Sequence, residues 1–244
     1  MKLVIITGAS RSGSTFFGEL MRQADNTRAR HEFIGGRDLF CVSAYCPNHP
    51  FVRHAIAEGL ARLAPPLDNA NMVAVDVNSN VVFCTDTIRA VRPDAALFHL
   101  VRDGRKVVAS NWVRKMYTCY AKGIDIRPAN EAELDGWNDL SRFEKLCWQW
   151  NRIVSEIRDK GVPAIRLEDA VADFDQLHET LLQPAGVELP KAVWEVSRSR
   201  RVNASKFKIR DLLRGRPVDL DWGPEHEKAF QRFCGQSMAE LGYA

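Results

Sequence analysis

Short apolar runs and helical patterns alternate along the whole chain. An apolar run that is rich in β-branched residues and closes on polar or glycine-containing sequence is typical of a buried strand. Buried strands of this kind form parallel sheets, so the pattern predicts an α/β fold with a parallel sheet flanked by helices on both faces. The predicted strands are residues 3–7, 72–76, 95–101 and 163–167, and a further strand with its trailing loop lies within 27–37.

The predicted helices carry apolar residues three or four positions apart. The longest begins at Ser141 and ends at Gly161, a residue type that favours the position just after a helix. A final helix starts at Pro224 and runs to about Leu241. Shorter helices are expected at 14–23, 85–91 and 174–182, and another after Gly104 with Val108, Trp112, Met116 and Cys119 on one face.

The 244 residues suit one α/β domain, so residues 1–244 are predicted to form a single domain. Three segments stand apart from the alternation of strands and helices. Residues 38–70 have only a weak helical pattern and contain two consecutive prolines; we expect a variable insertion there. Residues 122–140 are polar and are expected to form a mobile loop or lid, and residues 197–221 form a basic loop.

Charge and composition exclude several classes of protein. The net charge of +3 comes from 34 basic and 31 acidic residues, which is too balanced for a general nucleic-acid binder. The apolar run after Lys2 is too short for a signal peptide, and no run approaches the roughly 20 apolar residues of a membrane span. A cytoplasmic protein with no nucleic-acid partner is therefore expected.

The six cysteines show no metal-binding spacing and are expected to be free thiols in a reducing compartment. Cys41 and Cys46 lie close together in the sequence and are the one candidate pair for a disulfide.

The first strand leads into a glycine loop, Gly8 to Gly13, and then a helix. The loop N–H groups and the helix N-terminus point at one spot and favour an anion there. The spacing of the two glycines matches the start of a P-loop, but Ser14 and Thr15 stand where Lys and Ser/Thr are expected. Arg11 is the only cation inside the loop. A glycine turn that only packs strand against helix would not need this density of Ser, Thr and Arg.

The missing lysine separates two kinds of phosphate chemistry. A P-loop kinase needs that lysine and a Mg²⁺ held by Ser/Thr and a strand-end carboxylate, for which Asp76 and Asp103 are the candidates. A phosphosulfate group carries fewer charges than a triphosphate, so transfer of its sulfuryl group can proceed without a metal ion. If the loop binds such a group, no metal ion is expected. The alternative is a Mg²⁺-dependent kinase that acts on a small molecule.

A second group of residues follows the strand at 95–101. Arg102 closes this strand and therefore lies on the same carboxyl edge as the glycine loop. Ser110 falls in the second turn of the next helix and can face back toward that edge. A planar guanidinium and a hydroxyl suit a phosphate group. The competing interpretation is a strand-end arginine that caps backbone carbonyls and a serine packed in the middle of its helix.

At this point the motifs together resemble those of sulfotransferases of the bacterial and carbohydrate branch. Residues 10–15, SRSGST, are similar to the 5′-phosphosulfate loop of that family, and residues 100–110 are similar to its 3′-phosphate motif. Residues 165–169 and 201–205, followed by a terminal helix, also match in the right order. The resemblance spans nearly the whole chain.

The resemblance implies a PAPS-dependent sulfotransferase, where PAPS is 3′-phosphoadenosine 5′-phosphosulfate, the sulfuryl donor. The acceptor would be a hydroxyl or amine of a small molecule or carbohydrate, bound near 38–70 and 122–140, while 197–221 would close over the donor. The donor-binding residues implied are Arg11, Ser12, Gly13, Ser14, Thr15 and Phe16 for the 5′ end, and Arg102, Ser110, Arg201, Ser205 and Lys206 for the 3′-phosphate.

The general base is left open between several residues. Glu32 resembles the Glu that follows the P-loop helix in this branch, while His31 is adjacent and would point elsewhere in an extended strand. The chain departs from related members at Val77, where a Lys is common, so a cation at the leaving group would have to be Arg11 or Arg37.

Three further expectations concern residues outside these motifs. His99 is predicted to be a core histidine with satisfied hydrogen bonds, because it lies inside a buried strand. Trp148 and Asn151 lie off the apolar stripe of their helix and are candidates for adenine or acceptor contacts, or for covering a neighbouring loop. Finally, the basic segment 197–216 leaves a non-catalytic anion- or nucleic-acid-binding protein as another alternative.

Overall fold

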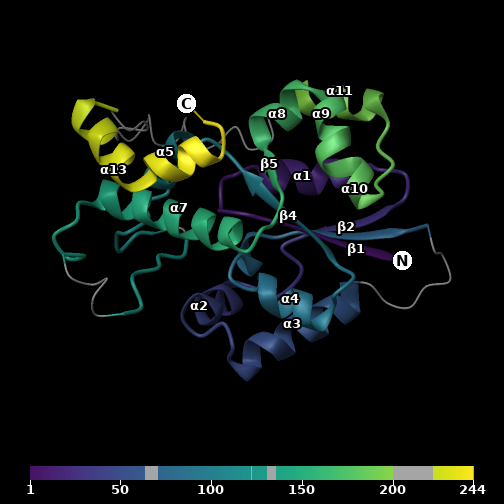
Figure 1. Cartoon of the computed structure of the whole chain (residues 1–244), viewed down its shortest axis with the longest axis horizontal. Coiled ribbons are helices and arrows are strands. Elements are labelled where there is room, and N and C mark those ends of the chain that lie inside the picture. Colours follow the sequence, from purple (N-terminus) through teal and green to yellow (C-terminus); the bar gives the residue numbers. More distant parts are fainter. Residues whose placement is uncertain (64–70, 122, 131–135, 200–221, 244) are drawn as a thin grey trace. The chain divides into compact units, whose positions relative to one another are not determined.

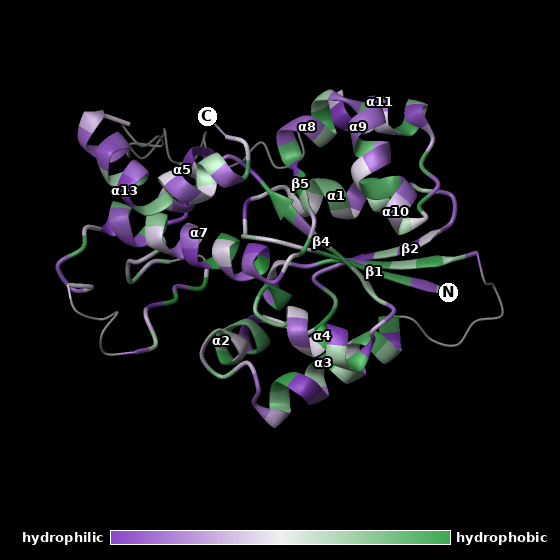
Figure 2. Cartoon of the chain, viewed as in Figure 1, coloured by the Kyte–Doolittle hydropathy of each residue, from purple (hydrophilic) through white to green (hydrophobic). Residues whose placement is uncertain are grey.

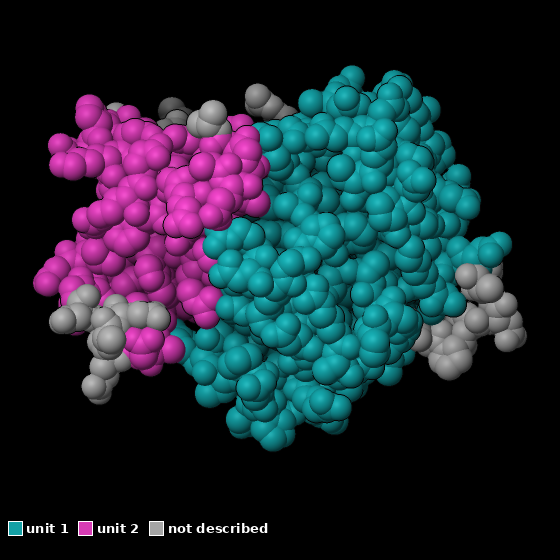
Figure 3. Space-filling view, in the orientation of Figure 1, with its two compact units in different colours: residues 1–102, 156–202 teal, residues 103–155, 203–244 magenta. Residues whose placement is uncertain are grey.

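The computed structural model describes residues 1–63, 71–121, 123–130, 136–199 and 222–243. The chain divides into two compact units, which Figure 3 colours separately. Unit 1 comprises residues 1–102 and 156–202, and unit 2 comprises residues 103–155 and 203–244. Each unit is described by itself below.

Unit 1 is built on a five-stranded parallel sheet in the order β2-β3-β1-β4-β5. The α/β fold class predicted from the apolar runs is thus confirmed, because each run lies in a strand. The strands are β1 (Lys2–Thr7), β2 (Thr27–His31), β3 (Val73–Val77), β4 (Ala96–Val101) and β5 (Ala164–Arg166).

Helices cover both faces of this sheet (Figure 1). One face carries α1 (Ser14–Met21), α8 (Leu167–Ala172), α9 (Phe174–Leu177), the π-helical turn η2 (His178–Leu182), α10 (Gln183–Ala185) and α11 (Lys191–Ser199). The other face carries α2 (Arg37–Tyr45), α3 (Pro50–Leu63) and α4 (Thr85–Val91), with the 3₁₀ turn η1 (Ser79–Val81) after β3. The helices are two-sided in hydropathy, while β1 and β4 are mostly hydrophobic (Figure 2).

The core of unit 1 follows from the buried strands. Val4, Ile6 and Val75 have no exposed surface and pack with Phe17 and Leu20 of α1 on one face of the sheet. Burying a side chain of this size stabilises a fold by about 1.5–3 kcal/mol. This core fixes the strand ends, and with them the loop that follows β1.

Unit 2 consists of helices and irregular segments in its described part. Its helices are α5 (Gly104–Val113), most of α7 (Arg142–Asp159, shared with unit 1) and α13 (Pro224–Glu240). The apolar stripe predicted for α7 is confirmed, since its seven residues are all buried: Phe143, Leu146, Cys147, Trp150, Ile153, Val154 and Ile157.

One helix prediction needs correction. The helix after Gly104 ends at Val113, so Met116 and Cys119 lie beyond it. Lys115 and Tyr117 both have a φ of 58°, a left-handed conformation that a helix cannot contain. In the segment 38–70, where the sequence has only a weak helical pattern, the structure has the regular helices α2 and α3.

The remaining predictions on the polar segments are only partly covered by the described residues. In the segment 122–140, Trp137 is buried against Trp148 of α7, with ring centroids 4.9 Å apart. Gln149 of α7 donates a hydrogen bond to the Ile124 carbonyl. Of the segment 197–221, residues 197–199 end α11, and the others lie outside the described residues.

Candidate active site

The candidate site lies at the carboxyl edge of the sheet, where β1 leads into the glycine loop. Gly8 sits so close to β4 that a Cβ there would overlap the Leu100 carbonyl oxygen. Arg11 and Gly13 have positive φ values of 74° and 100°. The loop therefore needs glycine at its start for space and at its end for conformation.

The N–H groups at the start of α1 are not capped by any side chain that the structure describes. Gly13 is the N-cap of α1 and makes no side-chain cap hydrogen bond, and the first turn of α1 contains no acidic residue. The first-turn N–H groups of Ser14, Thr15 and Phe16 precede the first helical hydrogen bond, from Phe17 N–H to the Gly13 carbonyl. A helix N-terminus of this kind attracts an anion.

The other loop residues have defined roles. The Ser12 side chain is almost fully buried, and its N–H donates to the Ala9 carbonyl at 3.2 Å, which closes the turn. The Ser14 hydroxyl lies 3.3 Å from Nε2 of His31. Phe16 packs on the apolar core and against Phe17, at 5.6 Å between ring centroids.

Arg102 connects the end of β4 to this loop. Its Nη1 donates a hydrogen bond to the Arg11 carbonyl oxygen at 3.0 Å. Its Nε is buried and has no hydrogen-bond partner among the described residues. A buried guanidinium donor without an acceptor is costly unless a ligand supplies one. Arg102 therefore caps the loop backbone, as the competing interpretation expected, and still offers a donor to a bound anion.

His31 is the last residue of β2 and Glu32 follows it, but the two contact different partners. Glu32 has a φ of 51°, and its Oε1 accepts a hydrogen bond from the Ser79 hydroxyl at 2.6 Å. His31 instead faces Ser14 at the start of α1, and its Cβ would lie 3.2 Å from a Cβ on Gly18. The extended conformation therefore ends at His31, and the backbone of Glu32 is left-handed.

The loop after β2 is fastened to the end of β3 by Asp76. Its Oδ1 accepts from the Phe33 N–H at 3.1 Å, and its Oδ2 accepts from the Ile34 N–H at 3.0 Å and from Asn78 Nδ2 at 2.8 Å. Burial raises the pKa of Asp76 above its ordinary value, and these hydrogen bonds oppose the rise. Asp76 thus holds backbone rather than standing open to a metal ion.

Asp103, the other strand-end carboxylate, caps α5 by accepting a hydrogen bond from the Arg105 N–H at 2.9 Å. Both candidates for the strand-end carboxylate of a Mg²⁺-dependent kinase therefore accept hydrogen bonds from backbone N–H groups.

Several predicted residues fall outside this cluster. Ser110 lies on α5 in unit 2, whereas Arg102 belongs to unit 1. Arg201, Ser205 and Lys206 lie outside the described residues. Their roles stay predictions.

Three expectations about other residues can be compared with the structure. His99 is fully buried, but neither ring nitrogen has a partner among the described residues, so the expectation of a satisfied histidine is wrong. Trp148 covers a neighbouring loop by packing on Trp137, and Asn151 accepts a hydrogen bond from Ser237. Cys41 and Cys46 are free thiols.

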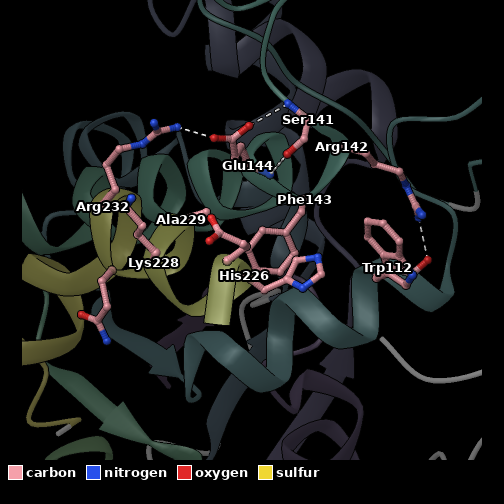
Figure 4. A pocket seen from close by; sticks show the side chains of 11 residues that line it. Trp112, Ser141, Arg142, Phe143, Glu144, His226, Lys228, Ala229 and Arg232 are labelled. Carbon is pink, nitrogen blue, oxygen red and sulfur yellow. Dashed lines mark hydrogen bonds and ion pairs between the residues drawn. The ribbon is translucent and has the colours of Figure 1, made fainter. Parts of the chain in front are cut away.

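Unit 2 has a pocket of its own, with a volume of about 800 Å³ (Figure 4). Arg142 stacks over the Trp112 ring and donates to the carbonyls of Trp112 and Met116, and Arg232 pairs with Glu144. Both guanidinium groups are thus engaged within the protein.

Ser79 belongs to none of the motifs that the sequence offers. The signal was present, because the polar residues 78–80 follow a buried strand at the carboxyl edge. Only the structure brings Ser79 to Glu32, from which it is 47 positions distant.

Comparisons with known proteins bear on the fold. No protein-family model and no curated protein matches this chain. Among solved structures, a sulfotransferase domain from the curacin biosynthetic pathway matches with a TM-score of 0.54 at 13% identity, covering 100% of this chain and 98% of that one. Sulfotransferase STF1 from Mycobacterium tuberculosis H37Rv matches with a TM-score of 0.50 at 12% identity, covering 96% of this chain and 76% of that one. The chain therefore has the α/β fold of these sulfotransferases.

In the part of the chain that the structure describes, no helix is long and apolar enough to cross a membrane.

Proposed function

We propose that this chain is a sulfotransferase that uses PAPS as donor and a hydroxyl or amine as acceptor. The observation that carries the proposal is Arg102, which binds the backbone of the glycine loop through Nη1 while its buried Nε has no acceptor among the residues that the structure describes. An arginine in this position suits a donor that carries anionic groups at two ends.

The residues present fit such a donor. Arg11 and the first-turn N–H groups of α1 would hold the 5′-phosphosulfate, together with the hydroxyls of Ser14 and Thr15. Arg102 would hold the 3′-phosphate, with Ser110, Arg201, Ser205 and Lys206 as further candidates. Bound PAPS would supply a sulfuryl group activated by its bond to phosphate.

The proposed step is an in-line displacement. Glu32 accepts the proton of the acceptor hydroxyl while that oxygen forms a bond to sulfur. Arg11 stabilises the phosphate oxygen, which keeps the electron pair of the broken sulfur–oxygen bond. His31 remains the second candidate for the base, although its contact with Ser14 directs it toward the donor loop. No metal ion takes part in this scheme.

Thermal shifts test the donor specificity. Adenosine 3′,5′-bisphosphate should raise the melting temperature, because a ligand that binds only the native state stabilises it. Adenosine 2′,5′-bisphosphate has the same charge with one phosphate moved, so it should give a smaller shift. A larger shift with ATP that requires Mg²⁺ would instead support the kinase alternative, and no shift with the 3′,5′-bisphosphate would contradict the proposal.

A further inference from the structure

We infer that Ser79 is a positioning residue that orients the carboxylate of Glu32 for proton transfer, an inference that rests on the proposed function. The Ser79 hydroxyl donates to Glu32 Oε1 at 2.6 Å. A short hydrogen bond to a carboxylate is charge-assisted and stronger than one between neutral groups. Among the described residues this is the one side-chain hydrogen bond that Glu32 makes, so Oε2 is left to accept a proton.

Ser79 is itself held rigidly. It begins the 3₁₀ turn η1, and its side chain is nearly buried. Asn78, just before it, caps this turn by accepting from the Asn80 N–H at 2.8 Å, and its own N–H donates to the Ile6 carbonyl of β1 at 2.8 Å. The Thr7 hydroxyl donates to the Asn78 carbonyl at 2.8 Å. The donor to Glu32 is therefore attached to the central strand of the sheet.

The backbone of Glu32 is fixed independently of Ser79. The Glu32 N–H donates to the Val77 carbonyl at 3.0 Å, and Asp76 holds the next two N–H groups. Without Ser79 the Glu32 backbone would keep its place, but the exposed carboxylate would rotate among several rotamers. Ser79 thus determines the direction of the carboxylate rather than the position of the loop.

Kinetic measurements on variants test this role, with water as the acceptor. PAPS turnover is followed as release of adenosine 3′,5′-bisphosphate, and binding of that product is measured separately. Ser79→Ala should lower kcat by about ten- to a hundred-fold, because a misdirected base loses much of the 10²–10⁴-fold that a positioned base contributes. The KM for PAPS and the affinity for the bisphosphate should stay unchanged. Ser79→Thr keeps the hydroxyl and should restore kcat.

A double-mutant cycle separates positioning from general stability. In a Glu32→Gln background, Ser79→Ala should have little further effect on kcat, because the two residues act through one group. Ser43→Ala is the matched control, since Ser43 is a buried serine of α2 whose hydroxyl donates to the Phe40 carbonyl at 3.2 Å and also bonds to the side chain of Cys84. It should leave kcat unchanged.

Two results would overturn the inference in distinguishable ways. Wild-type kcat in Ser79→Ala, with bisphosphate binding intact, would remove Ser79 from the mechanism while the proposed function stands. Failure of the wild-type protein to bind the bisphosphate would overturn the proposed function and the role of Ser79 with it.

Discussion

At the scale of single residues, Arg102 combines a structural contact with an open donor. Nη1 donates a hydrogen bond to the Arg11 carbonyl, and this bond orients the guanidinium toward the glycine loop. Nε is buried without a partner among the described residues, which costs free energy in the absence of a ligand. A residue that is partly unsatisfied at a strand end is typical of a binding site rather than of a core.

Replacing Arg102 should weaken donor binding with little effect on the fold. Arg102→Ala removes charge-assisted hydrogen bonds worth roughly 1.5–3 kcal/mol, so the affinity for adenosine 3′,5′-bisphosphate should fall by about ten- to a hundred-fold. Isothermal titration calorimetry measures the affinity. Arg92→Ala is the control, because Arg92 forms an ion pair with Asp94 just before β4 begins, whereas Arg102 lies just after β4 ends. Equal affinities for both variants would exclude Arg102 from the donor site.

At the scale of elements, the ends of four neighbouring strands build the site. The order β2-β3-β1-β4-β5 places β3 between β1 and β2, so residues at the end of β3 contact β1 on one side and the segment after β2 on the other. Asn78 contacts Ile6 and Thr7 of β1, while Asp76 and Ser79 contact residues 32–34. The end of β3 therefore holds the candidate base, Glu32, in place.

The backbone just after β1 packs closely against β4, and Gly8 leaves no room there for a side chain. Gly8→Ala should lower the free energy of unfolding by about 3 kcal/mol, because the added Cβ would overlap the Leu100 carbonyl and the backbone must shift. Urea denaturation measures the change. Gly36→Ala should stay within about 1 kcal/mol of wild type, since a Cβ there meets nothing within 4 Å. Similar stability of the two variants would contradict the close approach of β1 and β4.

At the scale of the whole molecule, one buried histidine makes stability depend on pH. Burial and, to a smaller extent, the charge of Arg158 together lower the pKa of His99 from 6.5 to about 4. Between these two values the unfolded chain binds a proton that the folded chain does not. The free energy of unfolding therefore falls as pH decreases from 6.5 toward 4.

The expected size of this effect is about 2 kcal/mol between pH 7 and pH 5. His99→Leu should remove that part of the pH dependence, because leucine does not titrate. Urea unfolding at both pH values measures it, with His54→Leu on the exposed surface of α3 as the control. An unchanged pH dependence in His99→Leu would show that His99 is not the group responsible.

The sequence carried much of the fold and part of the site. Strands β1, β3 and β4 were predictable because each is a buried apolar run, and the loop was predictable because Gly8, Arg11 and Gly13 lie within six positions. Strand β2 is a polar segment, TRARH, and was expected only from its place in the alternation of strands and helices. Helices α2 and α3 were missed because their apolar faces are only weakly periodic. The end of α5 was missed because nothing in the side chains of Lys115 and Tyr117 indicates a left-handed backbone.

The sequence by itself determined the α/β class and the glycine loop, since hydrophobic periodicity and glycine spacing are local properties. Only the tertiary structure decided which residues meet at the carboxyl edge of the sheet. Ser79 bonds to Glu32, Ser14 to His31 and Arg102 to the Arg11 carbonyl across separations of 47, 17 and 91 residues. These contacts depend on the order in which the strands pair, and strand order follows from the packing of the whole sheet rather than from any local pattern.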